Sequence, residues 1–162
     1  TDLNALADEY LRLAFHGMRA KDKSFNSEME TDFDQDIDQV MVVPQDIGRV
    51  LLNLITNAFH ALSQRQELDP NGYQPRIKLI TSKENGVIKI RVNDNGIGIP
   101  ESLRKKVFEP FFSTKGTGKG TGLGLSLSYD IITKGHGGTI EVQSEEGTGT
   151  EFIITLPNTN SY

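Results

Sequence analysis

The stretch RIKLITSKENGVIKIRVNDNGIGIP, residues 76–100, decides the class of fold that the sequence encodes. Apolar and polar residues alternate over residues 76–82, which is typical of a strand with one buried face. Asn85-Gly86 is a tight-turn signal, and the alternation resumes over residues 87–92. Two strands joined by so short a turn are antiparallel, which argues against the parallel sheet of a dinucleotide-binding fold.

Helical and strand patterns flank this hairpin on both sides. Apolar residues three and four apart indicate helices, whereas short runs bounded by turn residues indicate strands. The predicted helices cover residues 3–14, 44–66, 101–107 and 123–133. The other predicted strands cover residues 24–31, 39–43, 139–143 and 150–156. Helices packed against a mostly antiparallel mixed sheet make an α+β fold, a two-layer α/β sandwich.

Composition bounds the class of protein. The 162 residues are enough for one domain with its own core, and 36% hydrophobic and 24% charged residues are typical of a globular chain. The net charge of -5 argues against nucleic acid as a partner, because phosphate binding requires a basic face. With no cysteine and no apolar run of about 18 residues, we expect a cytoplasmic location. The chain begins with Thr1, so we expect a piece of a longer parent that could be membrane-anchored.

Four aspartates alternate over residues 32–38, which raises the question of a calcium loop. An EF-hand loop requires Gly at its sixth position and Glu at its twelfth. Those positions are occupied by Ile37 and Val43. We therefore interpret the acidic run as a solvated hairpin between the predicted strands 24–31 and 39–43.

Asn53 and Asn57 lie one helical turn apart, beside the apolar stripe of the predicted helix 44–66. His60 lies near the same face. Asparagine is a poor helix former, so a stacked pair calls for an explanation. Their carboxamide oxygens suit a hard cation such as Mg²⁺, which takes its other ligands from water and phosphate. The alternative is a polar flank that hydrogen-bonds a neighbouring loop.

Asp94 ends a predicted strand and is followed by Gly96 and Gly98. A carboxylate at this point can accept a hydrogen bond from an exocyclic amine, and the glycines would let a flat ring approach the backbone. The alternative is ordinary turn chemistry, because Asn-Gly is itself a turn signal.

Five glycines alternate over residues 116–124, immediately before a predicted helix. The first amides of a helix are free to bind an anion. The spacing fits neither the P-loop, which requires Gly-Lys followed by Ser or Thr, nor the dinucleotide fingerprint, which requires a βαβ unit. A flexible linker is the alternative, but it does not explain the apolar Leu123 and Leu125.

In this order, these segments resemble the ATP-binding domain shared by histidine kinases, DNA gyrase, mismatch-repair ATPases and heat-shock chaperones, whose fold is called the Bergerat fold. The resemblance extends from about Pro44 to Leu156. The matching segments are an N box at 53–58, glycine boxes at 94–98, 120–125 and 147–150, and an F box at 108–112.

The resemblance implies ATP and Mg²⁺ as cofactors. Asn57 would hold Mg²⁺ against the triphosphate, with Asn53 assisting. Asp94 would bind the adenine amine, and Thr150 would help through a water molecule. Residues from about 113 to 121 would form a mobile lid. The other expected nucleotide contacts are His60, Gly96, Gly98, Lys115, Lys119, Gly120, Thr121, Gly122, Leu123 and Gly124.

Within the superfamily, the sequence resembles the histidine kinases. The ATP-hydrolysing members place a glutamate four residues before the metal asparagine, where this chain has Asn53. An amide cannot act as a general base, so we expect transfer of the γ-phosphoryl group to a histidine and not to water.

The acceptor histidine is expected outside this chain. Acceptors of the family are followed by Glu or Asp, whereas the histidines here are followed by Gly17, Ala61 and Gly137. The expected partners are a histidine-bearing dimerisation domain of the same parent protein and a downstream response regulator. We expect residues 1–162 to form one monomeric catalytic domain, with residues 1–20 as the helix and connector that lead in from that hairpin.

Two alternative functions remain open from the residues. One is a serine kinase of the anti-sigma or mitochondrial dehydrogenase-kinase type, against which the F box argues. The other is a non-catalytic module that binds a nucleotide and signals its occupancy to a partner.

Overall fold

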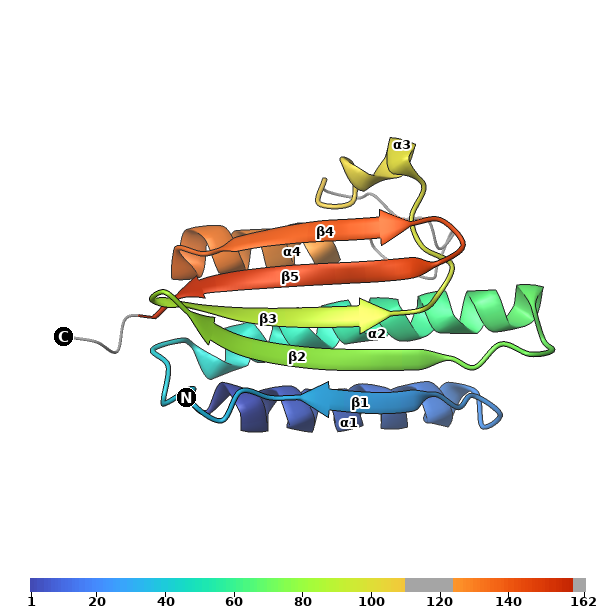
Figure 1. The fold of residues 1–162 in the computed structure, drawn as a ribbon, viewed down its shortest axis with the longest axis horizontal. Coiled ribbons are helices and arrows are strands. Elements are labelled where there is room, and N and C mark those ends of the chain that lie inside the picture. Colours follow the sequence, from blue (N-terminus) through green and yellow to red (C-terminus); the bar gives the residue numbers. More distant parts are fainter. Residues whose placement is uncertain (110–123, 159–162) are drawn as a thin grey trace.

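The computed structural model describes residues 1–109 and 124–158 of the chain. Its five-stranded sheet has the order β1-β2-β3-β5-β4 (Figure 1). β1 pairs with β2 in parallel, and the other three pairings are antiparallel. The strands are β1 (Glu28–Asp32), β2 (Arg76–Glu84), β3 (Val87–Asp94), β4 (Thr139–Glu145) and β5 (Gly149–Pro157).

Helices α1, α2 and α4 lie together behind one face of the sheet, which makes two layers (Figure 1). The helices are α1 (Leu3–Lys21), α2 (Pro44–Leu68), α3 (Glu101–Arg104) and α4 (Gly124–Asp130), and α4 continues into a π-helical turn, η1 (Ile131–Gly135). This arrangement confirms the predicted α+β two-layer sandwich. None of the helices in the described ranges is both long and apolar enough to cross a membrane.

The core lies between α2 and the inner face of the sheet. On α2 the predicted apolar stripe is completely buried, as its Leu51, Leu54 and Ile55 illustrate. On β2 the alternation predicted from sequence directs Ile77 and Leu79 inward. Burying each such side chain stabilises the fold by roughly 1.5–3 kcal/mol, so the amphipathic pattern fixes which face of α2 meets the sheet.

The β2–β3 hairpin forms as predicted. Asn85 and Gly86 adopt φ values of 48° and 79°, the left-handed conformation that such a turn requires. The register that follows pairs Ile77 with Asp94, and on the other side of β3 it pairs Asp94 with Thr150. Asp94 therefore lies between two neighbouring strands at the edge of the core.

The hairpin predicted between residues 24–31 and 39–43 is wrong. β1 is shorter than predicted and pairs with β2, and residues 39–43 form no strand. The Val40 backbone instead pairs with the first residue of the chain, through Val40 N–H to Thr1 O at 2.8 Å and the Thr1 amino group to Val40 O at 3.0 Å. The segment after β1 therefore runs to the start of α1.

Hydrogen bonds from backbone N–H groups to the Asp34 side chain order part of the acidic run in this segment. The Asp34 carboxylate accepts the N–H groups of Asp36 at 2.9 Å and Lys83 at 3.0 Å. These two hydrogen bonds lower the pKa of Asp34. The hydrogen bond from Lys83 ties the segment to β2, and the segment does not return along β1.

Two predicted helices differ in extent. The helix predicted over residues 101–107 ends at Arg104, and turns follow it. The helix predicted over residues 123–133 is α4 followed by η1, whose wider π-helical turn ends at Gly135. The Thr133 hydroxyl donates to Tyr129 O at 2.7 Å across the junction between the two. Side-chain bonding of this kind competes with the regular backbone pattern of a helix.

Candidate functional site

Asp94 is a buried carboxyl at the end of β3, with only 5% of its surface exposed. The Gly96 N–H donates to its Oδ1 at 2.8 Å, and the Thr150 N–H is a second backbone donor. Burial raises the pKa of Asp94 to about 7, although both N–H groups act to lower it. The side chain therefore changes charge near neutral pH.

The turn after Asp94 packs directly on α2. The Ile97 N–H donates to Ala61 O at 3.3 Å. A Cβ atom on Gly96 would lie 2.7 Å from the Ala61 Cβ, so only glycine fits this contact. Ala61 lies one helical turn after Asn57 on α2. The carboxyl group and the predicted metal ligand thus belong to elements in direct contact.

Gly98 meets the turn between β4 and β5. Its φ is 75°, and a Cβ atom there would lie 2.2 Å from Glu145 O. The Gly147 N–H donates to Ile97 O at 2.7 Å, which joins the same two segments. Close backbone packing is therefore one reason for the glycine at this position. That Gly96 and Gly98 also admit a flat base stays a prediction.

Thr150 is buried, and its hydroxyl lies 2.8 Å from the Ser144 hydroxyl. The Ser144 Oγ accepts the Ile99 N–H at 2.7 Å and donates to Gly149 O at 2.9 Å. Because a serine has a single hydroxyl hydrogen, the Thr150 hydroxyl is the donor in its pair with Ser144. Ser144 thus links both glycine turns, although no motif in the sequence singles it out.

Asn53, Asn57 and His60 are partly buried at the side of the buried stripe of α2, as predicted from their spacing. The Asn53 Nδ2 donates to the Ser128 hydroxyl at 3.4 Å. Ser128 is completely buried on α4. The asparagine face of α2 therefore contacts the helix that begins the second described range of the chain.

Several predicted contacts lie outside the described residues, and Gly124 is the first residue of α4. The predicted site residues outside the described ranges are Lys115, Lys119, Gly120, Thr121, Gly122 and Leu123. Of the F box, Phe108 and Glu109 are described, and the Phe108 ring packs near Phe152 of β5 at 6.2 Å between centroids.

Two further residues, Arg65 and Tyr73, hold the turn after Asp94 and were missed from sequence. The Arg65 guanidinium donates to Asn95 O at 2.8 Å and lies over the Tyr73 ring, 4.6 Å from its centroid. The Tyr73 hydroxyl donates to the same Asn95 oxygen at 2.9 Å. A basic residue in the last turn of a helix is ordinarily explained by the helix dipole, so Arg65 gave no separate signal.

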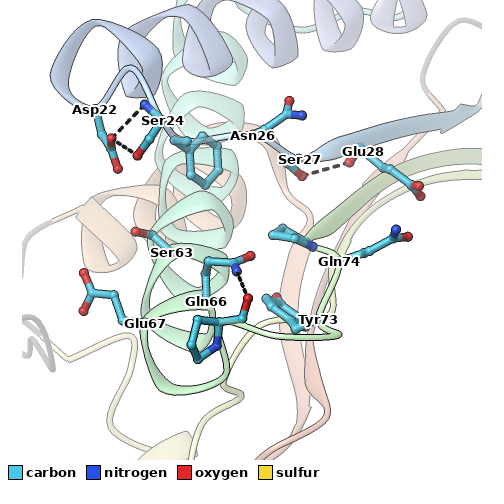
Figure 2. A pocket seen from close by; sticks show the side chains of 13 residues that line it. Asp22, Ser24, Asn26, Ser27, Glu28, Ser63, Gln66, Glu67, Tyr73 and Gln74 are labelled. Atoms are coloured by element: carbon cyan, nitrogen blue, oxygen red, sulfur yellow. Dashed lines mark hydrogen bonds between the residues drawn. The ribbon is translucent and has the colours of Figure 1, made fainter.

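A hollow lies beside the C-terminal end of α2 (Figure 2). Figure 2 shows that it is walled by the segment before β1, by α2, and by the loop that leads into β2. Its lining includes Asp22, Ser63, Glu67 and Tyr73. The Asp22 carboxylate there accepts the Ser24 hydroxyl at 2.6 Å, so one of its acidic groups already has a partner in the chain.

A five-stranded sheet covered by helices on one face, with a buried carboxyl at a glycine turn on α2, is the architecture of Bergerat-fold ATP-binding domains. The chain belongs to the family described as histidine kinase-, DNA gyrase B-, and HSP90-like ATPase, which matches residues 42–160. The resemblance predicted from sequence is thereby confirmed.

Within this broad family, several relatives of the chain are sensor histidine kinases. Sensor histidine kinase ZraS of Escherichia coli (strain K12) is 32% identical over 157 residues, covering 96% of this chain and 30% of ZraS. Signal transduction histidine-protein kinase AtoS of the same strain is 38% identical over 156 residues, covering 96% of this chain and 23% of AtoS. The chain thus spans less than a third of either protein.

Among solved structures, the nucleotide-free catalytic domain of histidine kinase ThkA matches with a TM-score of 0.76 and 30% identity. The match covers 98% of this chain and 93% of that domain. The described fold is therefore that of an ATP-binding catalytic domain of the sensor histidine kinases.

Proposed function

We propose that this chain binds Mg-ATP and transfers the γ-phosphoryl group to a histidine on a separate dimerisation domain of the same parent protein. That histidine would then supply a response regulator. The observation that supports the proposal most is the buried Asp94 carboxyl, held by two backbone N–H groups in a turn that packs on the asparagine-bearing helix α2.

Adenine recognition follows from the chemistry of Asp94. A carboxylate is an acceptor-only group, so it pairs with the exocyclic amine of adenine and not with the carbonyl that guanine has in its place. Its burial excludes competing water, which makes the choice more selective. The buried Thr150 hydroxyl, opposite Asp94 on β5, is suited to a water-mediated contact with the same base.

Residues present on α2 fit a magnesium ion. In residues 1–109 and 124–158 there is no group of three His, Cys, Asp or Glu side chains that could hold a metal by itself. A magnesium ion would be held by the Asn57 carboxamide oxygen, with Asn53 assisting, and by phosphate oxygens, because hard cations prefer oxygen ligands. When bound, Mg²⁺ supplies positive charge that offsets the charge developing on the phosphates. His60, one turn of α2 further on, is our candidate for a phosphate contact.

The amide at position 53 favours phosphoryl transfer to a histidine over transfer to water. A carboxylate at this position would activate water, whereas an amide has no proton-accepting function near neutral pH. The Asn53 amide also donates to Ser128, which orients it toward α4. The chain's own part in catalysis would then be to bind and orient the triphosphate. From the sequence, we expect the backbone amides of residues 113–124 to contact the phosphates.

The acceptor histidine is proposed to lie on another domain. His136 is unsuited to accept a phosphoryl group, because both of its ring nitrogens are engaged. Its Nδ1 lies 2.8 Å from Ile131 O, and its Nε2 accepts the Val43 N–H at 3.1 Å. A neutral imidazole with a free nitrogen would serve as the nucleophile.

We also propose that residues 1–162 form a single monomeric domain. The burial of Leu3, Ala7 and Leu11 of α1 in the common core supports a single domain. α1 is therefore packed as an integral part of the fold. Light scattering should give the mass of one chain.

The deciding experiment incubates the chain with γ-labelled ATP, Mg²⁺ and a separately produced histidine-bearing hairpin. The account predicts label on the hairpin that is lost in acid and survives alkali, as expected for phosphohistidine. An acid-stable label would instead indicate the serine-kinase alternative. ATP binding with no transfer to any acceptor would indicate the non-catalytic module.

A further inference from the structure

Arg65, in the last turn of α2, binds the backbone on both sides of the Asp94 site. Its Nη1 lies 2.8 Å from Asn95 O, 3.4 Å from Gly96 O and 3.3 Å from Thr148 O. The first of these is the strong contact, because its length is that of a charge-assisted hydrogen bond. One side chain thus joins the turn after β3 to the turn before β5.

The Asn95 oxygen and the Gly96 N–H belong to one planar peptide group. The peptide is trans, so its oxygen and its hydrogen point in opposite directions. Arg65 donates to the oxygen, while the hydrogen is donated to Asp94 Oδ1 at 2.8 Å. Fixing one end of this group fixes the direction of the other end, and a positive charge at the oxygen strengthens the N–H as a donor.

Tyr73 acts on the same oxygen. Its hydroxyl donates to Asn95 O at 2.9 Å, and its ring supports the Arg65 guanidinium. Burial raises the pKa of Tyr73 to about 12, so the hydroxyl remains a donor at every pH of interest. Asn95 is itself fixed, because its side chain accepts the Arg76 N–H at 2.8 Å and donates to Gln74 O at 2.9 Å.

We propose that Arg65 is a positioning residue for the Asp94 carboxylate. Through the peptide group between Asn95 and Gly96, it holds the N–H that this carboxylate accepts. The inference rests on the proposed function only in that Asp94 is the group expected to bind adenine. The arrangement lets α2, which bears the predicted metal ligands, set the geometry of the base site as well.

The test compares Arg65→Gln, Arg65→Lys and the wild-type chain. Asp94 is titrated directly by carbon NMR of its carboxyl in nucleotide-free protein, and ATP and ADP affinities are measured at pH 7. Arg65→Gln should raise the pKa of Asp94, because the Gly96 N–H that lowers it becomes a poorer donor. Affinity for both nucleotides should fall about tenfold, and Arg65→Lys should recover part of each change.

Arg49→Gln is the matched control, because Arg49 is an exposed arginine on the same helix and its loss changes the net charge equally. It should alter neither quantity. Tyr73→Phe removes the second donor to the Asn95 oxygen, so it should shift the pKa in the same direction as Arg65→Gln. Circular dichroism establishes that each variant is folded.

The outcomes separate this inference from the proposed function. An unchanged Asp94 pKa in a folded Arg65→Gln variant would overturn the positioning role, whether or not ATP binds. If the wild-type chain binds ATP and the Arg65→Gln variant binds it with the same affinity, the positioning role is also overturned. A raised pKa in a chain whose wild type binds no ATP would leave the positioning of Asp94 standing and refute the proposed function.

Discussion

Thr150 of β5 lies directly opposite Asp94 of β3, and its backbone N–H donates to the Asp94 carboxyl. The sheet thus supplies one of the two N–H groups that hold this carboxyl, and the turn after β3 supplies the other. A buried acid at the edge of the core is costly unless hydrogen-bonded, so two strands and a turn are arranged around this one side chain.

Replacing Asp94 with Asn should weaken ATP and ADP about tenfold or more and leave bare triphosphate nearly unaffected. The asparagine has the same shape, but its amide presents a donor where the adenine amine needs an acceptor. Calorimetry with the three ligands measures the difference. Equal losses for ATP and triphosphate would contradict the assignment of Asp94 to the base.

Folding stability should depend on pH through Asp94. Its pKa is raised from 3.8 to about 7 in the folded chain, so the folded state holds the proton more tightly than the unfolded state does. The stabilisation from Asp94 is therefore fully present below about pH 4, is lost as the pH rises to about 7, and changes no further above that. Each pKa unit of difference corresponds to about 1.4 kcal/mol.

Urea unfolding of the wild type and Asp94→Asn between pH 4.5 and 8 tests this dependence. The asparagine does not titrate, so the free energy of unfolding of the wild type should fall relative to that of the variant across the window. Two curves that stay parallel throughout would show that burial does not raise the pKa of this carboxyl.

Asn57→Ala should abolish the magnesium dependence of ATP binding while the domain stays folded. The residue is only partly buried beside the core stripe of α2, so its loss leaves the packing largely intact. Titration of ATP with and without Mg²⁺ measures the effect. Ser63→Ala is a control on the same helix, facing the hollow of Figure 2, and it should behave as wild type. A normal magnesium response in Asn57→Ala would remove this residue from the site.

Substitutions at Gly98 and Gly147 test how closely the turn after β3 packs against the turn between β4 and β5. Both have a left-handed φ, 75° and 84°. A Cβ atom would lie 2.2 Å from Glu145 O at Gly98, but it would meet nothing within 4 Å at Gly147. Gly147→Ala should therefore cost only the backbone strain of about 1–2 kcal/mol, and Gly98→Ala roughly 2 kcal/mol more. Thermal unfolding that ranks the two variants equally would contradict the close contact at Gly98.

Features encoded by neighbouring residues were predictable from the sequence. The hairpin at Asn85-Gly86 depends on a turn between adjacent alternating runs, and the stripe of α2 depends on spacing within one helix. The place of Asp94 at the end of a strand, before a glycine turn, was predictable because it is a local pattern, whereas its role in binding adenine stays a prediction. These features need no knowledge of which distant segments meet.

Features that depend on distant partners were not predictable. Residues 39–43 have a strand-like composition, yet Val40 pairs with Thr1, which is 39 residues earlier. Arg65 binds oxygens 30 and 83 residues away in sequence. These long-range hydrogen bonds leave no periodic pattern in the sequence, because they depend on how the folded sheet packs against α1 and α2.

The proposed function requires that the chain bind Mg-ATP between Asp94 and the asparagines of α2. Isothermal titration of Mg-ATP into folded wild-type chain tests it most directly. The account predicts heat that saturates at one nucleotide per chain and that Asp94→Asn largely removes. No heat from well-folded protein, or heat that Asp94→Asn leaves unchanged, would contradict it.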